Sequence, residues 1–135
     1  MNFPEWLSGV ENWMRQSEDT AARLTDAFLK TETTTGLLFN LFMIAVLPAL
    51  GEELLFRGVM LGALMKRMKP GAAALASAAV FAALHQSLLA FPVLLVIGLT
   101  LARLRISRGG LVLPMMFHGM YNFSVLLLNA SGASP

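Results

Sequence analysis

The order of apolar and polar residues divides the chain into an amphipathic start and an apolar remainder. Within residues 5–29, apolar side chains recur at helical spacing, with acidic residues and Arg15 between them. These apolar positions are Trp6, Val10, Trp13, Met14, Ala21, Leu24 and Phe28. We expect one amphipathic helix here, or two helices broken near Ser17. The two tryptophans suit the edge of a lipid bilayer, and packing on the protein's own core explains the pattern equally well.

Four apolar segments follow a polar run at residues 31–35. They cover residues 37–68, 71–90, 91–104 and 111–129. Because about 20 helical residues span a hydrocarbon core of roughly 30 Å, the first segment is longer than one span needs and the third is short. The loops at residues 66–70 and 103–110 hold six of the seven basic residues that follow position 33. Positive charge in short loops marks the cytoplasmic side, so we expect both loops there.

This pattern predicts an all-α fold, a polytopic membrane helix bundle of about four apolar helices preceded by an amphipathic N-terminal helix. We expect residues 1–35 to form the amphipathic, interfacial segment and residues 36–130 to form the membrane-embedded core. The alanine-rich run at residues 72–83 and the GxxxG pair of Gly58 and Gly62 offer small surfaces for close packing between helices.

Composition supports a membrane protein and excludes several other classes. Hydrophobic residues make up 56% of the chain and charged residues 13%, whereas soluble domains are roughly 45–50% apolar and about 25% charged. Six acids and three basic residues lie in residues 1–32, and seven basic residues and two acids lie beyond them. The basic residues form short clusters between apolar runs, so we expect a lipid bilayer and no nucleic acid as partner. The absence of cysteine excludes disulfides and thiolate metal sites.

Five ionisable residues lie inside the apolar segments, where each costs about 2.5–3.5 kcal/mol to insert. They are Glu52, Glu53, Arg57, His85 and His118, and Asn122 is their uncharged companion. Counted along helices from the basic loops, Glu52, His85 and His118 lie at a similar depth of about 14–18 Å. Three helices can therefore direct polar groups into one cavity.

Spacing along the first apolar segment separates two adjacent glutamates. Glu53 and Arg57 are four residues apart on one helix face, which is the geometry of an ion pair that neutralises both charges. Glu52 points about 100° away round the helix and has no local counter-charge. A carboxylate in that position suits a general base.

The histidines complete a candidate hydrolytic site. Phe81 and His85 share a helix face, and His118 and Asn122, also four residues apart, can reach the same ligand. With Glu52 they supply the parts for activating a water and holding an oxyanion. The carboxylate of Glu52 and the imidazoles of His85 and His118 are also a ligand set acceptable to zinc. Taken singly, His85 also fits a hydrogen-bonded core residue, and Asn122 fits a contact between helices.

Other hydrolytic and nucleotide-binding sites are excluded by missing motifs. The chain has no HExxH, no GxSxG and no phosphate-binding glycine loop. No aspartate follows Asp26, so an aspartyl dyad cannot form in the apolar segments.

Three motifs resemble those of the CPBP family of intramembrane proteases, which comprises type II CAAX prenyl proteases and bacteriocin-processing or self-immunity proteins. Residues 52–57 read EELLFR and are similar to the family's EExxxR motif. Residues 81–85 are similar to FxxxH, and residues 118–122 to HxxxN. Each motif is short, but three in order, each in a separate apolar segment, are a specific combination.

The resemblance implies a bundle of membrane helices with a conical cavity open to the cytosolic side. For a bacterial protein it implies the inner (plasma) membrane, with the active site open to the cytoplasmic side. Members of the family usually carry further membrane spans before the first motif, and often another after the third. We therefore expect either a compact member or a fragment of a longer chain.

The resemblance also implies a role for each motif residue. Glu52 would activate the hydrolytic water with help from His85. His118 and Asn122 would stabilise the tetrahedral oxyanion, or His118 would join a metal site. The family is described both as metalloproteases and as glutamate-dependent enzymes. The remaining motif residues would order the site, and Glu53 would hold Arg57 through their ion pair. These residues are Glu53, Arg57 and Phe81.

Our leading hypothesis is an intramembrane endopeptidase that hydrolyses a peptide bond of a membrane-associated or lipidated protein or peptide. A non-catalytic membrane immunity or scaffold protein is the first alternative, and it predicts that Glu52→Gln leaves function and fold intact. A small transporter with a proton-linked glutamate is the second alternative, and it predicts solute flux that depends on Glu52.

Overall fold

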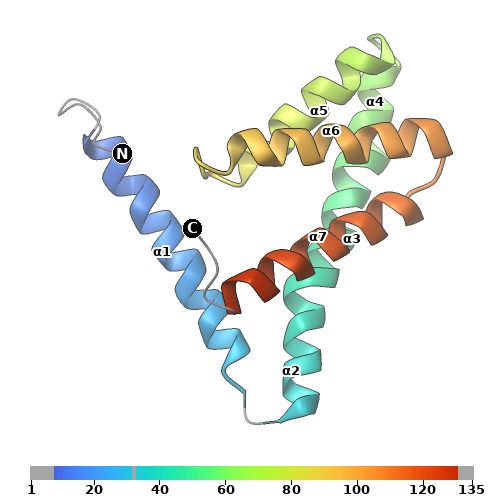
Figure 1. The fold of residues 1–135 in the computed structure, drawn as a ribbon. Coiled ribbons are helices and arrows are strands. Elements are labelled where there is room, and N and C mark those ends of the chain that lie inside the picture. Colours follow the sequence, from blue (N-terminus) through green and yellow to red (C-terminus); the bar gives the residue numbers. More distant parts are fainter. Residues whose placement is uncertain (1–7, 32, 131–135) are drawn as a thin grey trace.

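The computed structural model describes residues 8–31 and 33–130, and every regular element within them is helical (Figure 1). The all-α prediction is therefore confirmed for the described residues. The elements, in chain order, are α1 (Ser8–Leu29), α2 (Thr34–Leu41), η2 (Phe42–Val46), α3 (Leu47–Glu53), η3 (Leu54–Met60), α4 (Leu61–Met65), α5 (Pro70–Leu84), α6 (Phe91–Arg108) and α7 (Val112–Ala130).

A single helix of 32 residues, Thr34–Met65, combines α2, η2, α3, η3 and α4. We call it the long helix. The side chain of Thr33 caps its start by accepting a hydrogen bond from the backbone N–H of Gly36. The segments η2 and η3 are wider, π-helical turns. Pro48 follows η2 closely, and its ring would meet the carbonyl of residue 44 in a regular α-helix, which accounts for the wider turn there.

The N-terminal helix α1 is continuous, with no break at Ser17. It contacts α2 and α7, and Figure 1 shows it diverging from the long helix above their shared base. Met14 is buried, whereas Val10 and Trp13 are about half exposed. Trp6 lies outside the described residues, as do the side chains of Ala21 and Phe28.

The second apolar helix, α5, ends well before residue 90, where the sequence pattern predicted its end. His85 is the C-cap, and Gln86 has a positive φ of 55°. A left-handed residue ends an α-helix because its backbone cannot continue the hydrogen-bond ladder. The rest of the predicted span is a short connection to α6.

The third apolar helix, α6, is longer than predicted and runs to Arg108 instead of residue 104. The cluster of arginines predicted to be a loop is thus the end of the helix. Cations in the last turn interact favourably with the helix dipole, so they extend the helix and do not end it. The end is set by Gly109, whose φ of 71° is left-handed, and Arg105 Nη1 donates to the Gly109 carbonyl oxygen over 2.6 Å.

Helices α5 and α6 form a closely packed hairpin. The alanine-rich face of α5 is buried against α6 and the long helix, which confirms the packing predicted for residues 72–83. A Cβ added at Gly98 of α6 would lie 3.0 Å from Ala78 Cβ and 3.1 Å from its Cα. A side chain at this position would crowd Ala78, so glycine favours this close approach.

The predicted GxxxG contact is absent among residues 8–31 and 33–130. A Cβ added at Gly62 meets nothing within 4 Å, and one at Gly58 meets only Leu111 and a backbone oxygen at ordinary contact distances. Two glycines four residues apart mark a smooth helix face, but another helix must lie on that face for close packing. The close approach involves Gly98 instead.

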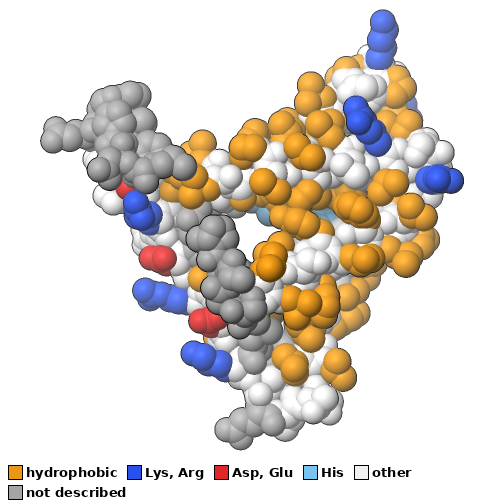
Figure 2. All heavy atoms as spheres, viewed as in Figure 1, with side chains coloured by type: hydrophobic (Ala, Val, Ile, Leu, Met, Phe, Trp, Pro, Cys, Tyr) orange, Lys and Arg blue, Asp and Glu red, His pale blue; other side chains and the backbone are white. Residues whose placement is uncertain are grey.

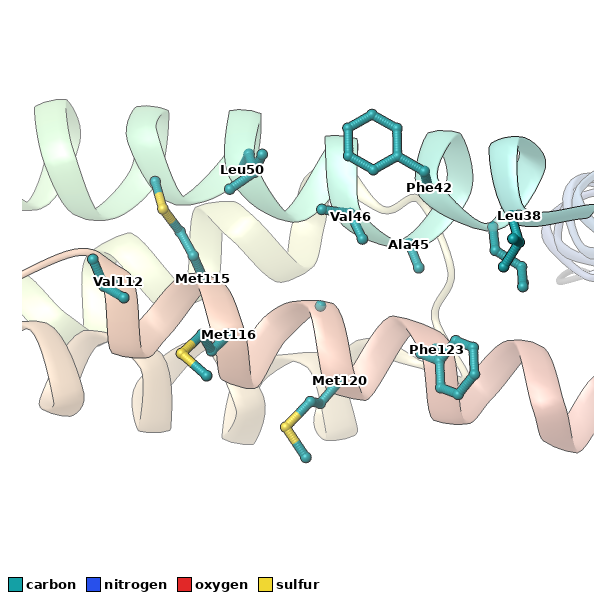
Figure 3. A pocket seen from close by; sticks show the side chains of 12 residues that line it. Leu38, Phe42, Ala45, Val46, Leu50, Val112, Met115, Met116, Met120 and Phe123 are labelled. Carbon is teal, nitrogen blue, oxygen red and sulfur yellow. The ribbon is translucent and has the colours of Figure 1, made fainter. Parts of the chain in front are cut away.

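The last helix, α7, agrees with its predicted bounds to within one residue and packs on the long helix and α6. A groove of about 750 Å³ lies between α7 and the outer side of the long helix (Figure 3). Its lining is apolar and includes Phe42, Val46, Met116 and Phe123. None of the candidate site residues lines this groove.

On the face seen in Figure 2, apolar side chains cover much of the surface beyond α1, and the long helix, α5, α6 and α7 all expose large hydrophobic side chains. The long helix is long and apolar enough to cross a membrane, and only 11% of its apolar window is buried inside the protein. A core helix of a soluble protein would be mostly buried, so this exposure favours a lipid-facing helix. Two further apolar helices are shorter, Pro70–Leu84 and Val112–Leu128. The predicted number of about four spans stays a prediction.

Replacing Gly98 with alanine should destabilise the fold, because the new methyl group has no room against Ala78. We expect the free energy of unfolding to fall by about 1–3 kcal/mol. Gly62→Ala is the matched control: it meets open space in the same kind of helix and should be neutral or stabilising by up to about 1 kcal/mol. Unfolding in detergent micelles, followed by circular dichroism, measures both. Equal losses in the two variants would contradict the close packing of α5 and α6.

Candidate active site

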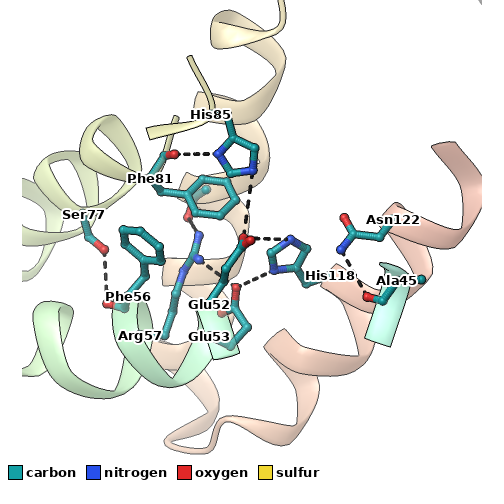
Figure 4. Close-up of polar contacts among 11 residues, drawn as sticks. Ala45, Glu52, Glu53, Phe56, Arg57, Ser77, Phe81, His85, His118 and Asn122 are labelled. Atoms are coloured by element: carbon teal, nitrogen blue, oxygen red, sulfur yellow. Dashed lines mark hydrogen bonds and ion pairs between the residues drawn. The ribbon is translucent and has the colours of Figure 1, made fainter. Parts of the chain in front are cut away.

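Three helices bring the motif residues together (Figure 4). The long helix carries Glu52, Glu53 and Arg57, the end of α5 carries His85, and α7 carries His118. The centre of the cluster is sealed: Glu53 and Arg57 are fully buried and His118 is 2% exposed. An intramembrane polar cluster has to satisfy its own charges and hydrogen bonds, because lipid offers neither.

The Glu53 carboxylate is shared between a cation and a histidine. Its Oε1 accepts a hydrogen bond from Arg57 Nη1 over 2.7 Å and lies 2.8 Å from His118 Nδ1. Arg57 Nη2 donates in turn to the carbonyl oxygen of Gly98, over 3.1 Å. This chain of contacts joins the long helix to α6 on one side and to α7 on the other.

The ring of Phe81 packs against the charged and aromatic members of the site. The guanidinium carbon of Arg57 lies 4.6 Å from its centroid, a cation–π distance. The His85 and His118 rings lie 4.6 Å and 5.6 Å from the same centroid. Phe56 meets it edge-on at 5.3 Å. Phe81 therefore separates Arg57 from solvent and fixes the planes of both imidazoles.

Glu52 faces the open side of the cluster. Its Oε2 lies 3.6 Å from His118 Nε2 and 4.0 Å from His85 Nε2. That oxygen is buried and has no hydrogen-bond partner, although the side chains of Glu52 and His85 as a whole are about one third exposed. A pocket of about 260 Å³ opens beside them, lined by Glu52, Leu55, Phe56, Leu84 and His85.

Asn122 lies one turn from His118 on α7 and points to the long helix. Its Nδ2 donates to the carbonyl oxygen of Ala45, in η2, over 3.2 Å. This is the helix–helix contact that the sequence offered as the alternative reading of Asn122. An amide nitrogen carries two hydrogens, so one remains for another acceptor.

Several contributors to the site are backbone carbonyls, which the sequence analysis did not identify. The carbonyl oxygens of Gly98 and Ala45 accept from Arg57 and Asn122, and that of Phe56 accepts from Ser77 Oγ over 3.3 Å. Any residue type provides such an acceptor. Only two features of the sequence could have pointed to these contacts: the small residue at position 98 and the serine inside the alanine run.

The buried ion pair should be essential to stability. Arg57→Ala strands the Glu53 carboxylate in a dry interior and should cost about 3–5 kcal/mol. The chain contains a matched control, because Glu11 and Arg15 have the same spacing and the same 2.7 Å distance but lie on the exposed face of α1. Arg15→Ala should cost only about 0.3–0.5 kcal/mol.

Unfolding of the two variants in detergent, under identical conditions, provides the comparison. A loss for Arg57→Ala no larger than that for Arg15→Ala would show that burial adds nothing to the Glu53–Arg57 pair.

Comparison with known proteins places this arrangement in a family. A family model described as "Type II CAAX prenyl endopeptidase Rce1-like" matches residues 34–124, from the start of the long helix into α7. An uncharacterized 24.3 kDa protein of Escherichia coli is 37% identical over 86 residues, which are 60% of this chain and 40% of that protein. The chain thus spans less than half of that relative's length. No solved structure matches. The chain belongs to the Rce1-like family of type II CAAX prenyl endopeptidases.

Proposed function

We propose that this chain is an intramembrane endopeptidase that hydrolyses a peptide bond of a membrane-associated or lipidated protein or peptide. The family is a protease family, which supports peptidase chemistry in general. The observation that carries the proposal is the position of Glu52 Oε2, which has no hydrogen-bond partner and lies between two imidazole nitrogens at the edge of a pocket.

In the proposed mechanism, Glu52 is the general base and His85 helps to hold the water. Glu52 Oε2 and His85 Nε2 are 4.0 Å apart. A water oxygen can therefore lie about 2.8 Å from both atoms, at hydrogen-bond distance. The water oxygen attacks the carbonyl carbon of the substrate as its proton passes to Glu52. His118 and Asn122 stabilise the oxyanion. Glu52 then gives the proton to the leaving amine, the C–N bond breaks, and the carboxylate is restored.

We further propose that the long helix, α5, α6 and α7 lie in the inner membrane of a bacterium and that α1, the described helix of the predicted N-terminal segment, lies at its surface. The apolar exterior and the bacterial relative support this location. The basic residues that follow α4 and those in the last turn of α6 favour a cytoplasmic position for that end of the bundle. In this arrangement the pocket beside Glu52 opens to the cytoplasmic side, and the substrate is anchored in the membrane.

In a second version of the proposal, the same site binds a divalent metal ion. Two imidazoles and a carboxylate suit zinc, with Glu52, His85 and His118 as the ligands. Bound zinc would polarise a carbonyl or lower the pKa of water. In residues 8–31 and 33–130, no three His, Cys, Asp or Glu side chains form a group that could hold a metal ion. As they stand, Glu52, His85 and His118 do not form a metal-binding group, so zinc would require these side chains to move closer together.

Glu52→Gln should abolish hydrolysis and leave the fold intact. Removing a general base lowers the rate by about 10²–10⁴-fold, whereas the amide keeps the shape of the side chain. A set of lipid-anchored peptides, incubated with proteoliposomes and analysed by mass spectrometry, reports cleavage. Glu11→Gln, on the exposed face of α1, is the matched control and should cleave as the wild type does.

The same assay separates the alternative functions. Cleavage that survives Glu52→Gln would contradict the assignment of the base. A folded wild type that cleaves none of the peptides, with Glu52→Gln equally stable, would favour the immunity or scaffold function. Solute flux into the vesicles that depends on Glu52 would favour a transporter.

Elemental analysis of the detergent-purified protein tests the zinc version. That version predicts close to one zinc ion per chain, lost in both Glu52→Gln and His118→Ala. Hydrolysis that persists after a chelator has removed all metal would rule it out and leave the glutamate-driven route.

A further inference from the structure

His118 lies between two glutamates, with one ring nitrogen turned to each. Nδ1 is 2.8 Å from Glu53 Oε1, a hydrogen-bond distance, and Nε2 is 3.6 Å from Glu52 Oε2, which is too long for one. A neutral imidazole has one N–H and one lone pair. The contact with Glu53 therefore decides which nitrogen carries the hydrogen.

Glu53 can only accept from His118. Its carboxylate is fully buried, and the same oxygen, Oε1, already accepts a hydrogen bond from Arg57 Nη1 over 2.7 Å, so it has no hydrogen to donate. Arg57 is itself held by the carbonyl of Gly98 and by the Phe81 ring. The hydrogen of neutral His118 thus lies on Nδ1, and its Nε2 presents a lone pair to Glu52.

His85 is fixed in the same way by a different acceptor. Its Nδ1 lies 2.8 Å from the carbonyl oxygen of Phe81, which can only accept. The His85 Nε2 lone pair therefore also faces Glu52 Oε2. With neutral rings, three electron-rich atoms therefore meet with no hydrogen among them, at separations from Glu52 Oε2 of 3.6 Å and 4.0 Å.

We propose that Glu53 is the positioning residue of His118: it holds the Nδ1–H tautomer and so keeps the Nε2 lone pair directed at Glu52. This rests on the proposed peptidase function and refines it. At rest the site accepts hydrogen bonds from a water and offers none from its histidines. Asn122 is then the oxyanion donor at the start of the reaction, and His118 donates only while its Nε2 holds the proton that the water gave to Glu52, before that proton returns through Glu52 to the leaving amine.

The chain has only two histidines, so nitrogen-15 labelling of histidine gives two ring signatures in detergent micelles. His85→Gln assigns them. In the wild type, both rings should show a protonated Nδ1 and an unprotonated Nε2. A wild-type His118 with its hydrogen on Nε2 would overturn the proposal, and this test needs neither substrate nor activity.

A double variant separates positioning from simple loss of stability. Glu53→Met with Arg57→Met removes the acceptor without leaving a buried charge, a replacement that proteins often tolerate. His118 should then move its hydrogen to Nε2 and donate to Glu52, whereas His85 should keep its signature because the Phe81 carbonyl is intact. Arg57→Lys, which keeps Glu53 and a cation, is the control and should leave His118 unchanged. An unchanged His118 tautomer in the folded double variant would refute the role of Glu53.

Hydrolysis provides the second readout. A misplaced catalytic group costs about 10²-fold, and we expect a loss of that size in kcat for the folded double variant, with Glu11→Gln on α1 close to wild type. If the wild type itself cleaves nothing, the proposed function fails, and the tautomers still decide the positioning role.

Discussion

The structure depends on the need to neutralise one buried carboxylate. Glu53 is fully buried, and an unpaired charge in such a place would cost several kcal/mol. Arg57, one turn along the same helix, supplies the counter-charge over 2.7 Å. Arg57 Nη2 donates in turn to the carbonyl oxygen of Gly98. That contact brings α6 against the long helix, and the small residues of α5 make room for it. The packing of three helices thus follows from one ion pair.

The same carboxylate links packing to chemistry. Because Glu53 Oε1 also binds His118 Nδ1, the helix α7 is oriented by the group that holds α6. The Phe81 ring covers the guanidinium, and its carbonyl oxygen binds His85. Both histidines are therefore oriented by acceptors in the interior, and both direct their other nitrogen to Glu52. The contacts that hold the helices together therefore also orient the two imidazole rings.

The sequence predicted what depends on spacing along one helix, and missed what depends on contacts between helices. The ion pair of Glu53 and Arg57 follows from a separation of four residues, and the structure contains it. The bond from Glu53 to His118 joins residues 65 positions apart, and no local pattern encodes it. The end of α6 was misplaced because charge was taken as a sign of a loop, although arginines near a helix C-terminus are favourable. The GxxxG prediction failed because a smooth face says nothing about which helix lies on it.

Two adjacent glutamates thus have opposite environments, and this difference is the main argument for a reactive site. Glu53 points inward, where it is sealed, paired and fully buried. Glu52 is 32% exposed, and its Oε2 faces imidazole nitrogens that offer it no hydrogen. Glu53 Oε2 also lacks a hydrogen-bond partner, but the Glu53 side chain is fully buried, whereas Glu52 lines a pocket. A buried oxygen without a hydrogen-bond partner costs stability. A water that binds beside Glu52 Oε2 during the reaction would supply the missing hydrogen bond, which explains why this oxygen is left open.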